Sequence, residues 1–362
     1  MGLCRASKRA AMRLGLLELL ACSLCYGREF SVAVHEEDSR EIRVGKVDCK
    51  GCGAASEIEE GILNTLGTPT EIVRAEIAGN ALVAKTERSS ATDEWLLGLP
   101  RTYALYYSDK DESWQNEEKE VRALVELVDP KPGDVVLDLG AGTSWTTDLL
   151  ARRGCRAIAI DVSTEKYVGL SSSDVYMKHH GSYYERVVAD MSSRLPFNDS
   201  RFDVIFAFSA VHHAPDVEST FREVARLLKP SGSFALVEAT RGMLESRNRF
   251  GLREREQYGL NEHKYSLREY QRLATATCLS LQVYPAPSFF AKMDGLQHGS
   301  LRIPGPLALK HRIGKIMART FWKHSRSREI ATELYPLLCH LIGMQILVIA
   351  RKASPASGVD RS

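Results

Sequence analysis

The central part of the chain alternates short aliphatic runs with longer amphipathic stretches. Residues 135–139 carry four aliphatic positions in five, as expected for a parallel strand covered on both faces. Similar runs predict four further strands, at residues 157–160, 186–189, 202–208 and 233–237. Apolar residues at helical spacing predict amphipathic helices at residues 117–128 and 217–228. This alternation of strand and helix predicts an α/β fold with a doubly wound, mostly parallel sheet.

The region that follows predicts one more helix and two more strands. Ser266 is a candidate N-cap with Glu269 three residues later, which is the pattern of a capping box. Strands are expected at residues 279–284 and 344–350, and roughly 60 residues separate them. We therefore expect a large insertion before the last strand.

A glycine turn after the first predicted strand carries the first chemical signal. Gly140 and Gly142 permit a sharp turn and let a ligand approach the backbone closely. Asp138 precedes the turn, and Asp161 ends the next strand, where a carboxylate can accept both hydroxyls of a ribose. A third glycine and a Gly-Lys-Ser/Thr sequence are both missing from this turn. The turn therefore favours a nucleoside-like ligand without a pyrophosphate.

Four segments resemble, in the right order, the motifs of the class I S-adenosylmethionine-dependent methyltransferases of type 11. They lie within about residues 115–240, and they are Val-Leu-Asp-Leu-Gly-Ala-Gly-Thr at 136–143, Val-Val-Ala-Asp-Met at 187–191, the strand and loop at 202–216, and the helix end, turn and strand at 227–238. The resemblance implies a Rossmann-like sheet of seven strands whose last two form an antiparallel hairpin. An unrelated doubly wound domain is the alternative.

The resemblance also implies a role for each motif residue in binding S-adenosylmethionine. The methionine part of the cofactor is expected at the glycine turn, the ribose at the end of the second strand, the adenine at the end of the third, and the methyl donor at the end of the fourth. The residues in that order are Asp138, Gly140 and Gly142; Asp161; Asp190 and Met191; and Phe208 and Ser209.

Two adjacent histidines follow the fourth strand. If the methyl acceptor is a hydroxyl, His212 or His213 is placed to act as a general base. Histidines that only cap the strand are an equally good interpretation. The catalytic assignment therefore depends on their geometry.

The N-terminal part carries two Cys-x-x-Cys pairs, Cys22/Cys25 and Cys49/Cys52. Two such knuckles can supply four thiolates to one structural zinc ion in tetrahedral geometry, whereas free thiols in a small fold are the alternative. Short strands are expected between the pairs, at residues 30–34 and 41–44.

This region resembles a small zinc-ribbon family whose members activate tRNA and protein methyltransferases. The resemblance rests on the knuckles and on the sequence around residues 16–22 and 58–62. Ser23 and Leu63 stand where that family usually has proline. The resemblance implies a zinc-ribbon-like domain at residues 1–66.

The remaining segments complete the expected organisation. Residues 67–114 form a connector, with tyrosines and Trp114 that could cover the cofactor or simply pack on the sheet. The methyltransferase domain is expected at residues 115–352, with the insertion at 290–343, and residues 353–362 are expected to be a disordered tail. Basic and apolar residues at 305–330 suit peripheral contact with a membrane or an anionic substrate, and a solvated helix packed on the sheet is at least as good an interpretation.

The net charge and the first 21 residues narrow the classes of function that the sequence allows. Lys plus Arg number 48 and Asp plus Glu number 46, so a dedicated nucleic-acid binder is disfavoured. Arg and Lys residues before the apolar run at 14–21 imitate a signal peptide, but Glu18 interrupts that run, and Met12 is an alternative start. We expect a cytoplasmic methyltransferase acting on a small-molecule, sugar or lipid-linked acceptor. A tRNA- or protein-modifying enzyme and an inactive methyltransferase-like scaffold are the alternatives.

Overall fold

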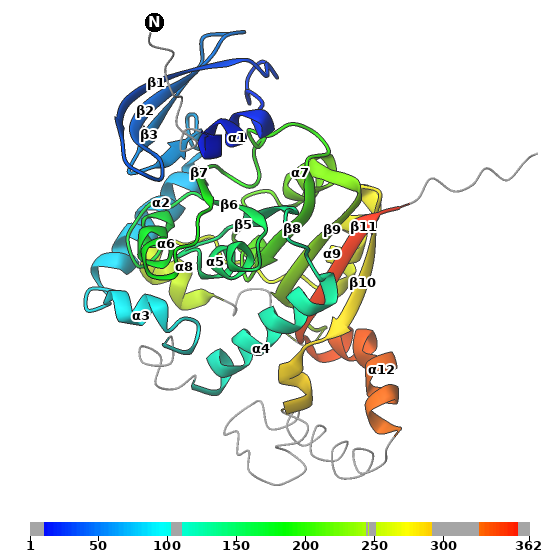
Figure 1. The fold of residues 1–362 in the computed structure, drawn as a ribbon. Coiled ribbons are helices and arrows are strands. Elements are labelled where there is room, and N and C mark those ends of the chain that lie inside the picture. The colour runs from blue at the N-terminus through cyan, green and yellow to red at the C-terminus, as the bar shows by residue number, and fades with distance from the viewer. Residues whose placement is uncertain (1–10, 103–110, 244, 246–250, 292–325, 354–362) are drawn as a thin grey trace, which may run out of the picture.

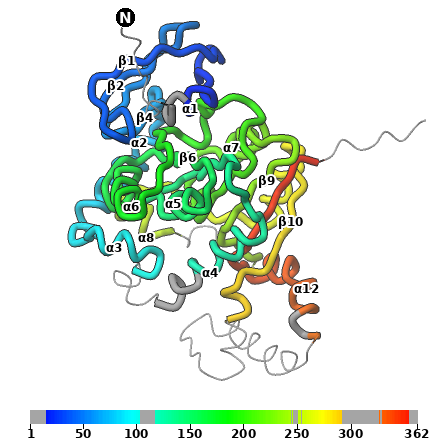
Figure 2. The backbone as a smooth tube through the Cα atoms, viewed as in Figure 1, coloured from blue at the N-terminus to red at the C-terminus, as the bar shows by residue number. Residues whose placement is uncertain are grey.

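A computed structural model describes residues 11–102, 111–243, 245, 251–291 and 326–353 (Figure 1). One sheet runs through these residues, with eleven strands in the order β1-β2-β3-β4-β7-β6-β5-β8-β9-β11-β10. Figure 2 shows the N-terminal strands in blue at one end of the molecule and α12 in orange at the other. The prediction of seven strands is therefore wrong, and the difference lies in the N-terminal part of the chain.

The centre of the sheet is parallel, as predicted. The strands that form it are β5 (Val135–Leu139), β6 (Arg156–Asp161), β7 (Glu185–Val188), β8 (Phe202–Phe208) and β9 (Leu228–Ala239). β5 lies between β6 and β8, so the order of the strands reverses next to it. Ligands of doubly wound sheets collect at such a point, outside the carboxyl ends of the strands.

Helices cover both faces of this sheet. Apolar side chains of α4 (Asp111–Val128), α5 (Trp145–Arg152) and α6 (Ser173–His180) pack on one face. The other face packs against α1 (Ala11–Leu19), α7 (Val217–Leu227), α9 (Leu267–Ala276) and α12 (Ser327–Ile342). Further helices are α2 (Glu71–Lys85), α3 (Asp93–Leu97), α8 (Leu252–Tyr258) and the 3-10 turns η2 (Leu170–Ser172) and η3 (Val211–His213).

The far edge of the sheet is antiparallel. β11 (Gln345–Lys352) inserts between β9 and β10 (Leu279–Pro285) and runs antiparallel to both. This arrangement confirms the antiparallel hairpin of the last two strands. The capping box before α9 is also present, because Ser266 and Glu269 each bond the other's backbone N–H.

Four N-terminal strands extend the other edge of the sheet. β1 (Phe30–Glu37), β2 (Ile42–Cys49), β3 (Ala55–Glu59) and β4 (Ile62–Asn64) form an antiparallel series. β4 then pairs in parallel with β7, through Leu63 opposite Val187. The sheet continues because β7 would otherwise present unpaired backbone groups, and β4 satisfies them.

Buried polar contacts join this extension to the rest of the molecule. The side chain of Arg186 on β7 is 1% exposed and lies 2.6 Å from a Glu41 oxygen and 2.5 Å from an Asp174 oxygen. Asn198 also donates from Nδ2 to the carbonyl of Leu20 at 2.8 Å. The N-terminal strands are thus packed and bonded against the central sheet.

Three predicted features lie mainly outside the described residues. They are the connector tyrosines at positions 103, 106 and 107, the tail at residues 353–362, and most of the insertion, of which the structure describes residues 290–291 and 326–343. Among the described helices, none is long and apolar enough to cross a bilayer. Membrane contact through residues 305–330 stays a prediction.

Candidate active site

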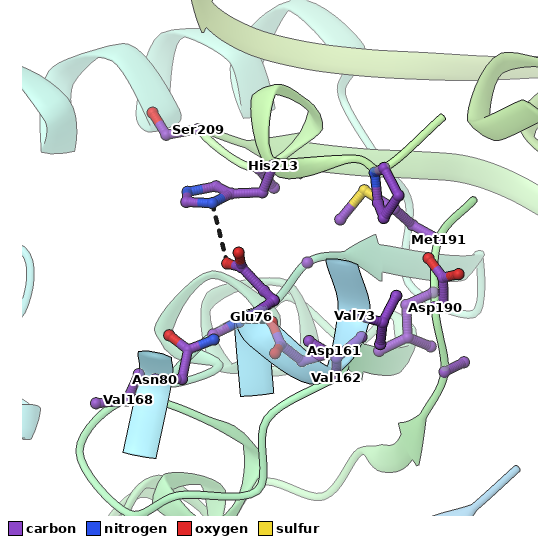
Figure 3. A pocket seen from close by; sticks show the side chains of 16 residues that line it. Val73, Glu76, Asn80, Asp161, Val162, Val168, Asp190, Met191, Ser209 and His213 are labelled. Carbon is purple, nitrogen blue, oxygen red and sulfur yellow. Dashed lines mark hydrogen bonds and ion pairs between the residues drawn. The ribbon is translucent and has the colours of Figure 1, made fainter. Parts of the chain in front are cut away.

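A cavity of about 180 Å³ opens at the carboxyl ends of β5, β6 and β7 (Figure 3). The sheet side of its wall comes from the strand ends and the loops that follow them. Helix α2, within the predicted connector, supplies Val73, Glu76 and Asn80 from the opposite side. The loop after β8 also contributes, so residues from four strand ends and from a segment far away in sequence meet around one space.

The glycine turn forms one wall of the cavity. Gly140 has φ +70° and Gly142 has φ +50°, a left-handed conformation that favours glycine. A Cβ on Gly140 would lie 2.6 Å from the Cβ of Ala210 and 3.0 Å from Cε of Met191. The turn thus needs glycine at position 140 both for its backbone conformation and for space.

Asp161 lies at the end of β6 and faces the same cavity. Its Oδ2 accepts the Gly142 N–H at 2.9 Å, and its Oδ1 accepts the Ser163 N–H at 2.8 Å. Each oxygen keeps a second lone pair that a ligand hydroxyl can use. Burial raises the pKa of Asp161 above its ordinary value. The position and the remaining acceptor capacity suit a ribose.

Asp138 has a different environment from the one its motif implies. It is absent from the cavity wall and lies buried beneath the turn, 1% exposed. Its Oδ2 accepts the hydroxyls of Thr146 and Thr147, each at 2.6 Å. Burial raises the pKa of Asp138 to about 6. In this structure Asp138 therefore holds the start of α5 against the turn.

The loop after β7 supplies the third part of the wall. Asp190 Oδ1 accepts the Ser192 N–H at 2.9 Å, and its Oδ2 accepts the Ser193 hydroxyl at 2.7 Å. Figure 3 shows Asp190 and Met191 side by side at the end of the cavity away from Ser209. This pairing of a carboxylate with a soft apolar side chain suits a flat base that carries an amino group.

A second cavity of about 210 Å³ adjoins the first and shares Gly140, Gly142 and Ser209 with it. Phe208 lines this second cavity and meets Trp145 edge to face, with ring centroids 5.6 Å apart. Ser209 therefore lies where the two cavities meet. All the motif residues except Asp138 line one of the two spaces.

Glu117 on α4 also lines the second cavity, and the sequence pattern gave no sign of it. Its Oε2 is buried and has no hydrogen-bond partner among the residues that the structure describes. Burial raises the pKa of Glu117 well above its ordinary value. A buried carboxyl oxygen without a partner is suited to an ammonium group of a ligand.

The two histidines lie in a network of three carboxylates. His212 Nδ1 is 2.7 Å from Glu238 Oε2, and His213 Nδ1 is 3.1 Å from Glu76 Oε1, a contact drawn in Figure 3. Glu262 approaches both rings, with 3.5 Å from each Nε2 to one of its oxygens. Burial alone lowers the pKa of His213, but the surrounding carboxylates outweigh burial and raise it to about 9.

The four knuckle cysteines also come together, as predicted. Cys22 Sγ is 3.6 Å from Cys52 Sγ, and Cys25 Sγ is 3.5 Å from Cys49 Sγ. All four sulfur atoms lie within 4.8 Å of one another. The N–H of Cys52 and other backbone contacts lower the pKa of the Cys49 thiol to about 7.

Comparison with known families matches the part of the chain that runs from β5 to β9. Residues 137–236 match the family model for a methyltransferase domain. The chain is 32% identical over 129 residues to an uncharacterized methyltransferase of Bacillus subtilis, YcgJ, a match that covers 36% of this chain and 50% of that protein. It is 34% identical over 129 residues to a demethylmenaquinone methyltransferase of Corynebacterium urealyticum, covering 36% of this chain and 49% of that one.

A sterol 24-C-methyltransferase of Eremothecium gossypii is 35% identical over 116 residues, or 29% of this chain and 28% of that protein. The solved structure of the Bacillus subtilis YcgJ protein aligns at 21% identity and a TM-score of 0.44, covering 66% of this chain and all of that one. The chain thus spans half or less of the length of these curated relatives. The matched domain and its relatives support an S-adenosylmethionine-dependent methyltransferase.

Proposed function

We propose that the chain transfers a methyl group from S-adenosylmethionine to a small-molecule, sugar or lipid-linked acceptor. The observation that carries the proposal is the cavity at the carboxyl ends of β5, β6 and β7. Its wall combines the Gly140 turn, the Asp161 carboxylate and the Asp190–Met191 pair. S-adenosylmethionine supplies an already activated methyl group, so the protein has mainly to align donor and acceptor.

Each part of the two cavities has a counterpart in that cofactor. Gly140 and Gly142 line the cavity without a side chain, so a sulfonium or ribose can approach the backbone of the turn. Asp161 retains acceptor capacity for two ribose hydroxyls. In the neighbouring cavity, the buried Glu117 carboxyl is placed to bind the cofactor's ammonium group. The match of the family model to residues 137–236 supports the same assignment.

The proposed acceptor class follows from the names of the relatives. The relatives' names include demethylmenaquinone and sterol methyltransferases, which is consistent with a small or lipid-linked acceptor. A cytoplasmic location and peripheral membrane contact through residues 305–330 belong to the same proposal. Flotation of the full chain with anionic and with neutral vesicles tests that contact, and binding to neither would argue against it.

Methyl transfer itself can be tested without knowing the acceptor. The full chain is incubated with a metabolite and lipid extract and with S-adenosylmethionine that carries a deuterated methyl group. Mass spectrometry should find a product heavier by the labelled methyl group. The Asp161→Ala variant should give much less of it. If no extract yields a labelled product, although the cofactor binds, the proposed acceptor class is wrong, and a tRNA- or protein-modifying enzyme and an inactive scaffold are the interpretations left.

We also propose that the four cysteines hold one structural zinc ion. Tetrahedral zinc with bonds of about 2.3 Å needs sulfur atoms roughly 3.8 Å apart, close to the separations in the structure. Metal analysis of the purified protein should find near-stoichiometric zinc, and Cys49→Ser should lose it. Fully folded wild-type protein without metal would refute this assignment.

A further inference from the structure

His212, His213 and Glu262 form a compact set of ligand atoms beside the cofactor cavity. Both histidines lie on η3, and Glu262 reaches them from the loop after α8. The Nε2 atom of each ring is 3.5 Å from a different oxygen of the Glu262 carboxylate. One ligand atom from each residue lies within 4.8 Å of the other two. Two imidazole nitrogens and one carboxylate oxygen thus converge on one point.

The two rings are oriented from behind by separate carboxylates. His212 Nδ1 donates to Glu238, and His213 Nδ1 lies against Glu76, so each ring directs Nε2 toward Glu262. Histidines that bind metals are held in this way, with a carboxylate on the nitrogen that does not bind. Once Nδ1 carries the proton, the Nε2 lone pair of a neutral ring is available to a cation.

The orienting carboxylates are themselves fixed. Glu238 Oε1 accepts the backbone N–H groups of Ala210 and Val211 at 3.0 and 2.8 Å. Glu76 Oε2 accepts the Asn261 N–H at 2.7 Å. The backbone of two different loops therefore holds both orienting carboxylates, so the ligand set is preorganised.

The three carboxylates around the histidines also give the cluster a negative charge that a cation would balance. Glu76, Glu238 and Glu262 are 9%, 1% and 8% exposed. Their ion-pair partners among the described residues are the two imidazoles. The ring centroids are only 4.4 Å apart, so one ion can lie within reach of both rings and of Glu262. A divalent ion there would balance part of the charge of the carboxylates.

We propose that His212, His213 and Glu262 bind one divalent first-row transition-metal ion, with Glu238 and Glu76 orienting the two rings. Two imidazoles favour ions such as zinc or iron(II) over magnesium or calcium, which prefer oxygen ligands. Three protein ligands leave at least one coordination position open. His213 and Glu76 line the cofactor cavity, so that position lies at its wall. On the proposed function, an oxygen of the methyl acceptor would occupy it.

Cobalt(II) is the probe that separates this site from the cysteine cluster. The full chain is titrated with Co²⁺ alone, and the visible spectrum is recorded. Nitrogen and oxygen ligands give visible bands without the sulfur-to-cobalt charge-transfer band that four thiolates produce. With the cysteine site filled by zinc, we expect one Co²⁺ bound per chain with the nitrogen and oxygen spectrum. A wild-type chain that gains no such spectrum would overturn the proposal.

Two variants and one control test which residues are involved. Glu262→Gln should abolish the spectrum, and Glu238→Gln should weaken Co²⁺ binding about 10- to 100-fold by loosening the His212 ring. His179→Gln is the matched control, because His179 and His180 are also adjacent but form no such three-ligand group among the described residues. If Glu262→Gln is unstable, Glu238→Gln carries the test. Unchanged Co²⁺ affinity in both would refute the site.

This test does not depend on methyl transfer. Co²⁺ binding is read without cofactor or acceptor, so an inactive scaffold would still give the spectrum. Conversely, a chain that methylates an acceptor while giving no spectrum would keep the proposed function and lose the metal site.

Discussion

Replacing Gly140 by alanine should damage both stability and cofactor binding, because two separate effects combine there. An L-residue in the left-handed conformation costs about 1–2 kcal/mol, and the lower entropy of the unfolded chain offsets about 0.4–1 kcal/mol of that. The new Cβ would also lie 2.6 Å from the Cβ of Ala210, where ordinary contacts begin at 3.4 Å. Overpacking of this kind adds about 1–3 kcal/mol.

Gly181 provides the matched control. Its φ is +67°, close to the +70° of Gly140, but a Cβ there would meet nothing within 4 Å. Gly181→Ala should therefore lose only about 1 kcal/mol, as in any left-handed position of this kind. Denaturant unfolding of both variants isolates the steric part as the difference between them.

Calorimetry with S-adenosylhomocysteine then tests the pocket. Gly140→Ala forces Ala210 or Met191 to shift, so we expect at least a tenfold loss of affinity. Gly181→Ala should bind as the wild type does. Equal stability loss and equal affinity in the two variants would refute the close approach at the glycine turn.

Three further changes probe other parts of the structure. Asp161→Ala should weaken cofactor binding by about 1–3 kcal/mol in the same calorimetric assay, since charged hydrogen bonds are lost. Burial raises the pKa of Asp138 to about 6, so folding disfavours its ionised form. The stability of the wild type relative to Asp138→Asn should therefore fall by on the order of 1 kcal/mol from pH 5 to 7.5, as measured by denaturant unfolding. Arg186→Met should lower the free energy of unfolding by roughly 3 kcal/mol in the same measurement, because it leaves the buried Glu41 with less neutralising charge. The double variant Arg186→Met with Glu41→Leu should recover part of that stability.

The central strands were predictable from the sequence because burial on both faces leaves long aliphatic runs. The strand at residues 202–208 has the predicted bounds, and β9 is longer than predicted at both ends. β3 and β4 were missed, because they are short and mix apolar with polar residues. The pairing of β4 with β7 was also beyond prediction, since it joins residues more than a hundred positions apart.

The residues of the candidate site were also predictable only in part. Motif residues that follow strand ends, such as Asp161 and Met191, line the cavity because the sheet brings strand ends together. Asp138 belongs to the same motif but lies under the turn, and only the hydroxyls of α5 explain its position. Glu76 and Glu262 could not be predicted, because an acid in a helix or loop carries no local sign that it meets a histidine far away in sequence.

The central claim is that the cavity at the carboxyl ends of β5, β6 and β7 binds S-adenosylmethionine. Titration calorimetry of the full chain with S-adenosylmethionine, and separately with NAD⁺, tests it most directly. The structure predicts one saturable site for S-adenosylmethionine and no detectable heat with NAD⁺, because the turn lacks the third glycine for a pyrophosphate. Absence of S-adenosylmethionine binding, or equal binding of NAD⁺, would contradict the assignment.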